Sequence, residues 1–310
     1  MKSNKITNKN IGNTNYTIEV LDPTNDALRE SFNQLFRKTF KFDFEDWYQA
    51  GYWTDDYQPH VIVENNKVIA NVSVYLMKMR WEGEEHLLAQ IGGVATVKNR
   101  RHQGLSRILM EGVIEKFRPL CEQIFLFCHK GVVEFYPRFG FIPSEEYDFT
   151  RIVDGKKIRQ NDTENVKIEH WSLTDQNKVQ CLLEKATRGN PFSAFSMTNS
   201  SNLLMFYLTK FYTKIVYFIE AFDVIILAEY EGKVLVISEI LGETNATLEQ
   251  IVDAMARKST KQVQLCFTPK KNHLYQETRL IEKGSYFYIL NPSSDVTAKK
   301  HYRFPVLSRT

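Results

Sequence analysis

The sequence predicts a mixed α/β (α+β) fold of two consecutive domains, each with a mostly antiparallel sheet flanked by helices. The chain has 310 residues and a mass of 36.3 kDa, which fits two domains of ordinary size. From residue 16 to about residue 148 the hydrophobic pattern alternates between the periods of strands and helices. The second half repeats this order of elements, which indicates internal duplication of one fold.

The first half begins with a strand and two helices, followed by an antiparallel meander. Leu28, Phe32 and Leu35 recur at helical spacing, and turn residues at 64–67 and 82–84 separate the meander strands. The expected elements are a strand at 16–21, helices at 27–40 and 44–50, strands at 60–63, 68–79 and 86–97, a helix at 105–117, a strand at 123–128, a short helix at 132–138 and a closing strand at 141–149.

A polar stretch at 154–164 separates the halves and is expected to be a linker between a domain at 1–153 and a domain at 165–310. The elements expected after it are helices at 173–185 and 202–212, strands at 215–221, 224–230 and 233–241, a helix at 247–258 and strands at 263–267 and 286–290.

Composition excludes several classes of function. The net charge of +3 is too small to indicate a nucleic-acid partner, and no apolar run reaches the ~18 residues that span a membrane. Residues 1–10 lack the apolar centre of a secretory signal and are expected to be a polar, frayed leader. The four cysteines show no zinc-binding spacing, so we expect no metal and a cytoplasmic location.

The segment 91–106, IGGVATVKNRRHQGLS, carries the clearest chemical signal. A strand here ends in a basic loop that leads directly into a helix, whose first amides and positive dipole end attract an anion. Gly104 allows the backbone to approach phosphates closely, and the small Ser106 leaves the next amide unobstructed. The pattern predicts a cradle for a pyrophosphate.

These residues resemble the GNAT superfamily of N-acetyltransferases, whose coenzyme A loop reads R/Q-x-x-G-x-G/A. Arg101–Ser106 matches this loop, with Ser106 in place of the final Gly or Ala. Residues 134–141, EFYPRFGF, are similar to the second signature of the family and follow the next strand, as the family requires. The resemblance implies two tandem GNAT-like domains, of which the first is catalytic and the second degenerate.

The tandem arrangement looks most like the Eis-type acetyltransferases. Those proteins usually continue into a third, sterol-carrier-like domain that brings the C-terminal carboxylate into the active site, whereas this sequence stops at Thr310.

The resemblance also implies roles for individual residues. Tyr136 would be the general acid that protonates the departing thiolate, although a core tyrosine is the alternative. An amide of Val94 or Ala95 could polarise the thioester oxygen. The residues implied to bind acetyl-CoA are Val94, Ala95, Thr96 and Val97, along the pantetheine arm, and Arg101, His102, Gln103, Gly104, Leu105 and Ser106, around the phosphates.

The general base stays open between His129 and Glu134. Cys128 could in principle form an acyl-enzyme, but we expect a buried structural thiol because direct transfer is the family norm. In the second half, Asn245–Thr247 takes the place of the phosphate loop without arginine or glycine, so that domain is not expected to bind coenzyme A.

Acidic and aromatic residues alternate at 42–57, where this family often shapes the acceptor pocket, and this composition suits a cationic amine. The alternative is a solvated helix with its aromatic residues in the core.

We therefore expect an N-acetyltransferase that moves an acetyl group directly from acetyl-CoA to a primary amine of a small, cationic acceptor. Two alternatives are an inactive coenzyme A-binding regulatory module and an acyltransferase for longer chains. The expected partner is a small-molecule amine, and the sequence leaves a homo-oligomer open.

Overall fold

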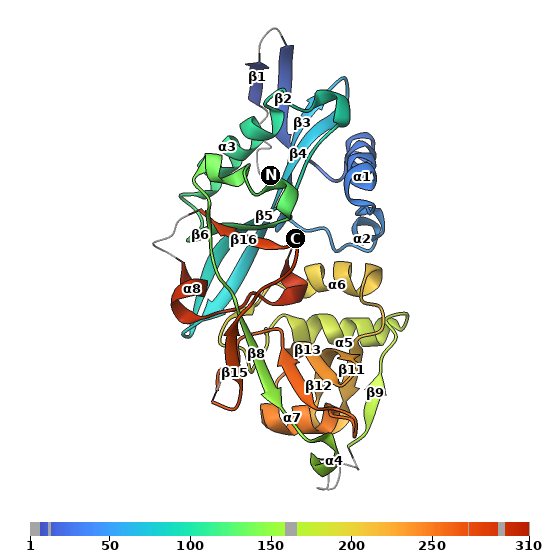
Figure 1. Ribbon diagram of the computed structural model, residues 1–310. Helices are drawn as coiled ribbons and strands as arrows, with labels where there is room; N and C mark the ends of the chain where they lie inside the picture. The colour runs from blue at the N-terminus through green and yellow to red at the C-terminus, as the bar shows by residue number, and fades with distance from the viewer. Residues whose placement is uncertain (1–6, 12–13, 159–165, 272, 291–294, 310) are drawn as a thin grey trace.

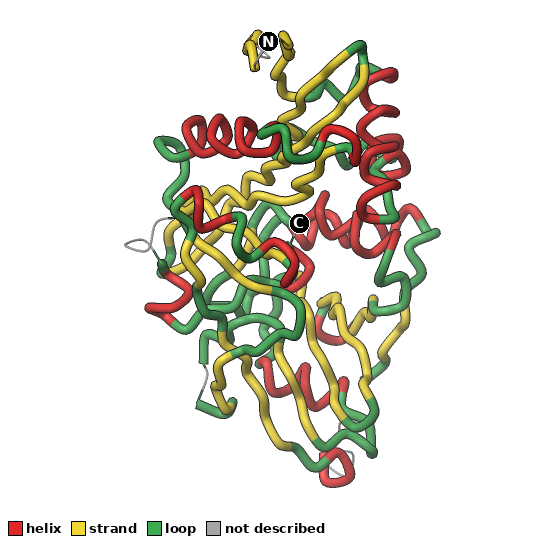
Figure 2. The backbone as a smooth tube through the Cα atoms, turned by 45° about the horizontal axis from the view of Figure 1, so that its top comes forward, coloured by secondary structure: helices red, strands yellow, loops and turns green. Residues whose placement is uncertain are grey.

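The structure, a computed structural model, describes residues 7–11, 14–158, 166–271, 273–290 and 295–309. Its strands form two sheets, one above the other in Figure 1, and each sheet has helices packed on both faces. Figure 2 shows the two groups of strands in yellow with the helices around them. The mixed α/β class expected from the sequence is confirmed.

The first sheet has the strand order β1-β2-β3-β4-β5-β6-β16-β7, and β10 also pairs with β4. The strand pairs are antiparallel except β5 and β6, which are parallel because α3 (Leu105–Phe117) connects them across one face. The strands are β1 (Thr7–Ile11), β2 (Thr14–Val20), β3 (Tyr57–Glu64), β4 (Lys67–Trp81), β5 (Glu84–Thr96), β6 (Gln123–Cys128), β7 (Ile142–Pro143), β10 (Ser196–Met197) and β16 (Tyr286–Ile289).

Alternation along β4 divides the core of this sheet between its two faces. Tyr75 and Met77 pack with α1 (Asp26–Phe40) and α2 (Glu45–Gln49) on one face. Val72 and Val74 pack with α3 on the other face, as the period of two in a strand requires. The meander strands and these three helices therefore lie where the sequence predicted them.

The second sheet has the strand order β15-β8-β14-β13-β12-β11-β9. Its strands are β8 (Tyr147–Ile152), β9 (Ile168–His170), β11 (Val216–Ile219), β12 (Val224–Glu231), β13 (Val234–Leu241), β14 (Gln262–Leu265) and β15 (Gln276–Arg279). The parallel pair β13 and β14 is joined by α7 (Leu248–Met255), and α5 (Gln176–Ala186) and α6 (Ser201–Lys210) pack on the opposite face. An antiparallel pair followed by a parallel crossover thus occurs in both sheets, as expected for a duplicated fold.

Helix α6 contributes to both units. Its residues Leu204, Met205 and Leu208 pack into the second unit, whereas Leu203 and Phe206 pack into the core beneath α1 and α2. Figure 1 shows α6 between α2 and α5, at the junction of the two units. A helix that is apolar on two sides is buried on two sides.

The sequence predicted one closing strand at 141–149, and this prediction is wrong. The structure has two strands there, β7 and β8, and they belong to different sheets. Only β7 stays in that sheet, and β8 crosses to the second sheet, where it pairs with β14. In return, β16 from the second half lies between β6 and β7 of the first sheet (Figure 1). Phe149 is fully buried opposite Leu265, and Ile289 is buried opposite Phe125, so burial of these apolar residues fixes the exchange. A boundary at residue 153 therefore does not separate the two sheets.

Three smaller expectations are corrected. Residues 7–10, expected to fray, belong to β1, which pairs with β2. The linker expected at 154–164 contains α4 (Gly155–Ile158), and its residues 159–164 lie outside the described residues. The short helix expected at 132–138 is replaced by two 3₁₀ turns, η2 (Lys130–Val132) and η3 (Tyr136–Phe139).

In the described part of the chain no helix is both long enough and apolar enough to cross a membrane.

Buried ion pairs fix the C-terminal segment that follows α8 (Val296–Lys300) against the crossing strand. The guanidinium of Arg303 donates hydrogen bonds to the Asp148 carboxylate and, at 3.2 Å, to the Leu265 carbonyl oxygen. Arg309 donates to the Glu146 carboxylate at 2.8 Å, and Glu146 also accepts the Phe304 amide at 2.9 Å.

Removal of one partner of a buried ion pair leaves the other charge uncompensated. We expect Asp148→Ala to lower the free energy of unfolding by about 3–5 kcal/mol, because Arg303 is buried. Equilibrium unfolding in urea measures the effect. Glu243→Ala, which breaks the exposed pair with Arg188, is the matched control and should leave the midpoint nearly unchanged. Equal midpoints for the two variants would contradict this role of Asp148.

Candidate functional site

The candidate site lies where two parallel strands separate. β5 and β6 pair only from Leu88 opposite Gln123 to Ile91 opposite Leu126. Beyond this point β5 continues along β4 as far as Thr96, and β6 continues along β16 as far as Cys128. We call the resulting gap, between 92–96 of β5 and 127–128 of β6, the wedge. A cavity of about 1400 Å³ occupies it, with lining residues from both faces of the sheet.

A β-bulge helps to turn β5 away from β6. The register between β4 and β5 shifts between Asn71 and Ser73, and Gly93 opposite the shift has φ +56°. A Cβ at Gly93 would lie 2.6 Å from Cζ of Phe36, so a glycine is required there. The Asn71 side-chain amide donates to the Gly93 carbonyl oxygen at 2.7 Å and to Oγ of Ser73 at 2.9 Å, which holds the bulge in place.

The helix start at α3 forms one end of the cavity. Gly104 is the residue before α3 and has φ +80°. No side chain caps the start of α3, and a Cβ at Gly104 would meet nothing within 4 Å. The first amides of α3 are therefore open toward the cavity. Nε of Arg101 donates to the Thr96 carbonyl oxygen at 3.2 Å, and its exposed guanidinium forms no ion pair with any described residue. This end suits an anion.

Ser106, the departure from the family loop, has a structural role. Its hydroxyl lies 2.7 Å from the Thr96 hydroxyl, in hydrogen-bond contact. This contact connects the first turn of α3 to the end of β5, so both ends of the loop at 97–104 are held in place.

The structure brings most of the implied cofactor residues together. Eight of them line the cavity, namely Val94, Ala95, Thr96, Arg101, His102, Gly104, Leu105 and Ser106. Val97 and Gln103 are not among the lining residues: Val97 packs into the cores, and the Gln103 amide donates to the Asn99 carbonyl oxygen at 3.4 Å. Their role in binding stays a prediction.

Tyr136 lines the cavity from the opposite side of the wedge. It begins the turn η3 and is only 6% exposed, with its ring packed against those of Phe141 and Tyr288. Burial, and in smaller part Cys128, raises the pKa of its phenol above the ordinary value. The hydroxyl therefore keeps its proton at neutral pH, as a proton donor must.

The two candidate bases differ in position. His129 lines the cavity, and its Nδ1 accepts a hydrogen bond from the Gly131 amide at 3.1 Å. Glu134 is exposed and is not among the lining residues. Only His129 is therefore placed to exchange a proton within the cavity.

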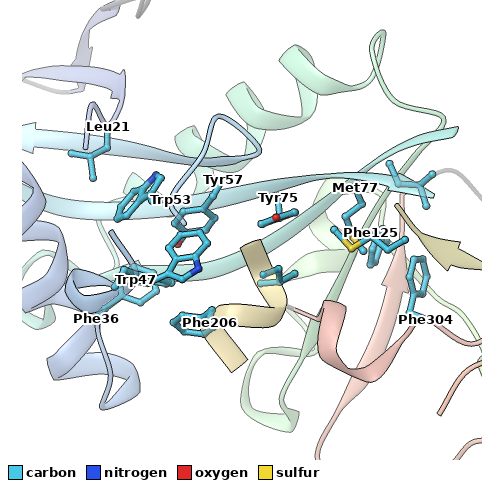
Figure 3. Close-up of a cluster of buried hydrophobic side chains, with 14 of the residues drawn as sticks. Leu21, Phe36, Trp47, Trp53, Tyr57, Tyr75, Met77, Phe125, Phe206 and Phe304 are labelled. Carbon is cyan, nitrogen blue, oxygen red and sulfur yellow. The ribbon is translucent and has the colours of Figure 1, made fainter. Parts of the chain in front are cut away.

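Aromatic side chains form the other end of the cavity. We call the group Phe42, Phe44, Trp47, Tyr57, Tyr75 and Phe206 the aromatic chamber. The Phe44 and Phe206 rings are stacked with centroids 5.2 Å apart, and the Trp47 indole donates to the Asn202 carbonyl oxygen at 2.7 Å. Figure 3 shows Phe206 of α6 below Trp47 and Tyr57. The chamber thus has walls from both units.

The acidic residues of 42–57 do not reach the cavity. Asp43 accepts hydrogen bonds from Arg37 at 2.7 Å and from Lys210, and Glu45 accepts from Arg29 at 3.0 Å and from Asn33 at 2.9 Å. Burial tends to raise the pKa of Asp43, but the Arg37 hydrogen bond and other contacts keep it below the ordinary value. The Arg29 hydrogen bond likewise lowers the pKa of Glu45. Both carboxylates are therefore ionised and already paired.

Sequence reasoning missed the residues that other helices supply to the cavity. These are Phe36, Thr39 and Phe40 of α1 and Leu203, Phe206, Tyr207, Phe211 and Tyr212 in and after α6. The available signal was α6 itself, because the run Leu203–Phe206 is apolar on every side of the helix.

The corresponding helix start in the second unit is closed. Oγ1 of Thr247 accepts the Gln250 amide at 3.2 Å, and the Gln250 side chain accepts the Thr247 amide at 2.8 Å. This capping box provides hydrogen-bond partners for backbone amides at the start of α7, whereas the start of α3 has no side-chain cap.

Comparisons with known proteins agree with this architecture. Residues 17–143 match the family model described as acetyltransferase (GNAT) domain. No curated protein matches the chain. Similar solved structures include a GCN5-related N-acetyltransferase from Kribbella flavida, with 16% identity, a TM-score of 0.54, and coverage of 91% of this chain and 74% of that chain.

Two further solved structures are similar. Eis1 from Mycobacterium abscessus has 11% identity and a TM-score of 0.56, covering 89% of this chain and 74% of that chain. A GCN5-related N-acetyltransferase from Anabaena variabilis has 15% identity and a TM-score of 0.54, covering 91% of this chain and 75% of that chain. At these identities the similarity shows a shared fold that extends over both units.

Cys128 should be an unreactive thiol. Burial raises its pKa from 9.0 to about 11, so its thiolate fraction at pH 7.5 is about 100-fold below that of an ordinary cysteine. We expect iodoacetamide to label Cys128 at least about 100-fold more slowly in the native protein than in urea, as measured by peptide mass spectrometry. Equal rates would indicate an activated thiol and would restore the acyl-enzyme alternative.

Proposed function

Since residues 17–143 match the family model described as acetyltransferase (GNAT) domain, we propose that this chain is an N-acetyltransferase that transfers an acetyl group from acetyl-CoA directly to a primary amine of a small acceptor. The observation that carries the proposal is the wedge between β5 and β6, with the open start of α3 at one end and a buried tyrosine beside it. In this proposal the unit built on the sheet that contains β5 and β6 carries the chemistry, and the unit built on the other sheet is degenerate.

The residues present fit acetyl-CoA, which when bound supplies the acetyl group as an activated thioester. The open amides of α3 and the exposed guanidinium of Arg101 suit its phosphates, because both present donors and positive charge. The backbone edge that faces the wedge, from Val94 to Thr96, suits the amides of an extended pantetheine arm. The open space at Gly104 permits close approach of a phosphate.

Tyr136 is proposed as the general acid. Its buried phenol holds a proton at neutral pH and lines the same cavity as β5, so it can protonate a thiolate that leaves there. An amide of Val94 or Ala95 could stabilise a developing oxyanion, and the choice between them stays open.

The acceptor belongs at the aromatic chamber, opposite the phosphate end. A cationic amine there would contact ring faces, since none of the cavity-lining residues in the described ranges is acidic. His129 is the base that we retain, because it lines the cavity and Glu134 does not.

Binding of acetyl-CoA tests the phosphate site. We expect Gly104→Glu to weaken binding at least about 10-fold, because the new carboxylate would project into the space proposed for the phosphates. Gly232→Glu is the matched control: Gly232 also has positive φ, +61°, and open space at its Cβ, but it lies in the turn between β12 and β13. Isothermal titration calorimetry of wild type and both variants measures the effect.

The outcomes of the titration separate the competing functions. Binding by wild type and Gly232→Glu, but not by Gly104→Glu, supports the proposed site. Absence of binding by wild type would refute the acetyltransferase proposal. Binding without release of coenzyme A in the presence of any amine would favour the inactive coenzyme A-binding module.

Substitution of the general acid should affect turnover but not cofactor affinity. We expect Tyr136→Phe to lower kcat about 10-fold or more, because general acid catalysis typically contributes 10²–10⁴-fold. Tyr288→Phe is the control, since Tyr288 packs against Tyr136 and its hydroxyl donates to the Val133 carbonyl oxygen at 3.4 Å. Assays of coenzyme A release at saturating amine measure kcat. An unchanged kcat for Tyr136→Phe would remove this role.

A further inference from the structure

The aromatic chamber is a continuous layer of rings. Phe206 lies in contact with Phe44, Phe42 and Trp47, with ring centroids 5.2, 5.6 and 5.9 Å apart. Tyr57 continues the layer from Phe44, at 5.1 Å, to Tyr75, at 6.4 Å. In Figure 3 the rings of Trp47, Tyr57 and Tyr75 lie along one face of the sheet, with Phe206 below them. Such spacing is that of aromatic rings in favourable contact, so a further ring entering the chamber would find the same partners.

The charges along the cavity are unevenly distributed. Its charged and titratable lining groups, apart from tyrosine hydroxyls and the Cys128 thiol, are Arg100, Arg101, His102, Arg107, His129 and Arg138, on the side of the phosphate loop and of Tyr136. No described residue that lines the cavity is acidic. Beside the chamber, Asp43 and Glu45 are held by Arg37, Lys210 and Arg29. A polycation would therefore meet like charges and no free carboxylate.

A single buried hydroxyl offers a polar contact in the chamber. Tyr75 is 1% exposed and lines the cavity, and its hydroxyl has no hydrogen-bond partner among the described residues. The Tyr57 hydroxyl, in contrast, is already bonded to Oγ of Ser73 at 2.9 Å. A buried donor without a partner costs free energy, and an acceptor atom of a ligand would satisfy it.

We infer that the acceptor is a hydrophobic primary amine that carries an aromatic ring, an arylalkylamine, and not a polyamine or an aminosugar. This inference rests on the proposed function and names its substrate class. The ring would lie among Phe42, Phe44, Trp47 and Phe206, and the amine would point toward the wedge. The chamber, unlike a site lined with carboxylates, binds the uncharged form of the amine.

The free energies of the two protonation states favour binding of the uncharged amine. A cation over an aromatic face gains about 0.5–2 kcal/mol, whereas removal of an ammonium ion from water without a counter-ion costs several kcal/mol. Desolvation in the chamber therefore lowers the pKa of the bound amine, which releases its proton to His129, the base retained above, before it reacts. This effect explains how the reaction proceeds without a carboxylate base in the cavity.

The substrate class is tested with a panel of amines. Release of coenzyme A from acetyl-CoA is followed with 2-phenylethylamine, spermidine and kanamycin. We expect kcat/KM for 2-phenylethylamine to exceed that for spermidine at least about 10-fold, because burial of a phenyl ring favours binding by at least this factor. Equal or faster reaction of spermidine or kanamycin would overturn the inference and leave the proposed function intact.

Variants locate the ring in the chamber. Phe206→Ala should lower kcat/KM for 2-phenylethylamine at least about 10-fold and leave acetyl-CoA affinity unchanged, and Phe206→Leu, which keeps more of the packing, should have a smaller effect. Phe218→Ala is the control, because Phe218 stacks on Trp171 in the second unit and does not line the cavity. Equal effects of Phe206→Ala and Phe218→Ala would overturn the inference.

Two further measurements distinguish failure of the inference from failure of the function. Binding of acetyl-CoA without any reaction of 2-phenylethylamine would overturn the inference. A preference for octanoyl-CoA over acetyl-CoA that Phe206→Ala abolishes would also overturn it, since this result would place an acyl chain in the chamber. No acetyl-CoA binding and no coenzyme A release with any amine would refute the proposed function itself.

Discussion

The separation of β5 from β6 is the constraint on which the rest of the site depends. Two parallel strands that stop pairing leave backbone groups without partners, and each such buried group costs about 1–3 kcal/mol. The fold maintains this state because both strands keep their outer partners, β4 and β16. Gly93 admits the bend where any side chain would meet Phe36. The unpaired edges are then stable but unsatisfied, and an extended ligand with amide groups can pair with them.

The exchange of strands makes this opening rigid. β16 comes from the second half of the sequence and supports β6, whereas β8 comes from the first half and extends the second sheet. The buried pair of Arg303 with Asp148 then fixes the returning chain at the junction. Because each half completes the sheet of the other, the units cannot separate without loss of strand pairing in both. Helix α6, buried on two sides, is thereby held as a wall of the cavity.

What the sequence could predict was local. The strand at 123–128 and the helix at 105–117 coincide with β6 and α3, and the loop between β5 and α3 lines the cavity, because periodicity and helix-start signals act over a few residues. The exchange of β8 and β16 was missed because any alternating apolar strand can pair with either sheet, and only tertiary packing decides. The place of the acidic residues of 42–57 stayed open for the same reason. Asp43 finds one of its partners, Lys210, in the other half of the chain, and no local pattern indicates such a pair.

The two helix starts show how a duplicated fold divides its functions. α3 and α7 occupy equivalent positions, each connecting two parallel strands. At α7 the Thr247 and Gln250 side chains satisfy the first amides from within the chain, which stabilises the helix and removes its affinity for an anion. At α3 the glycine at the same position provides no cap, so the amides depend on solvent or a ligand. Side-chain caps on these amides stabilise the helix, whereas uncapped amides can bind an anionic ligand. The first unit therefore retains the open helix start, and the second, with its start closed, contributes an aromatic wall of the cavity.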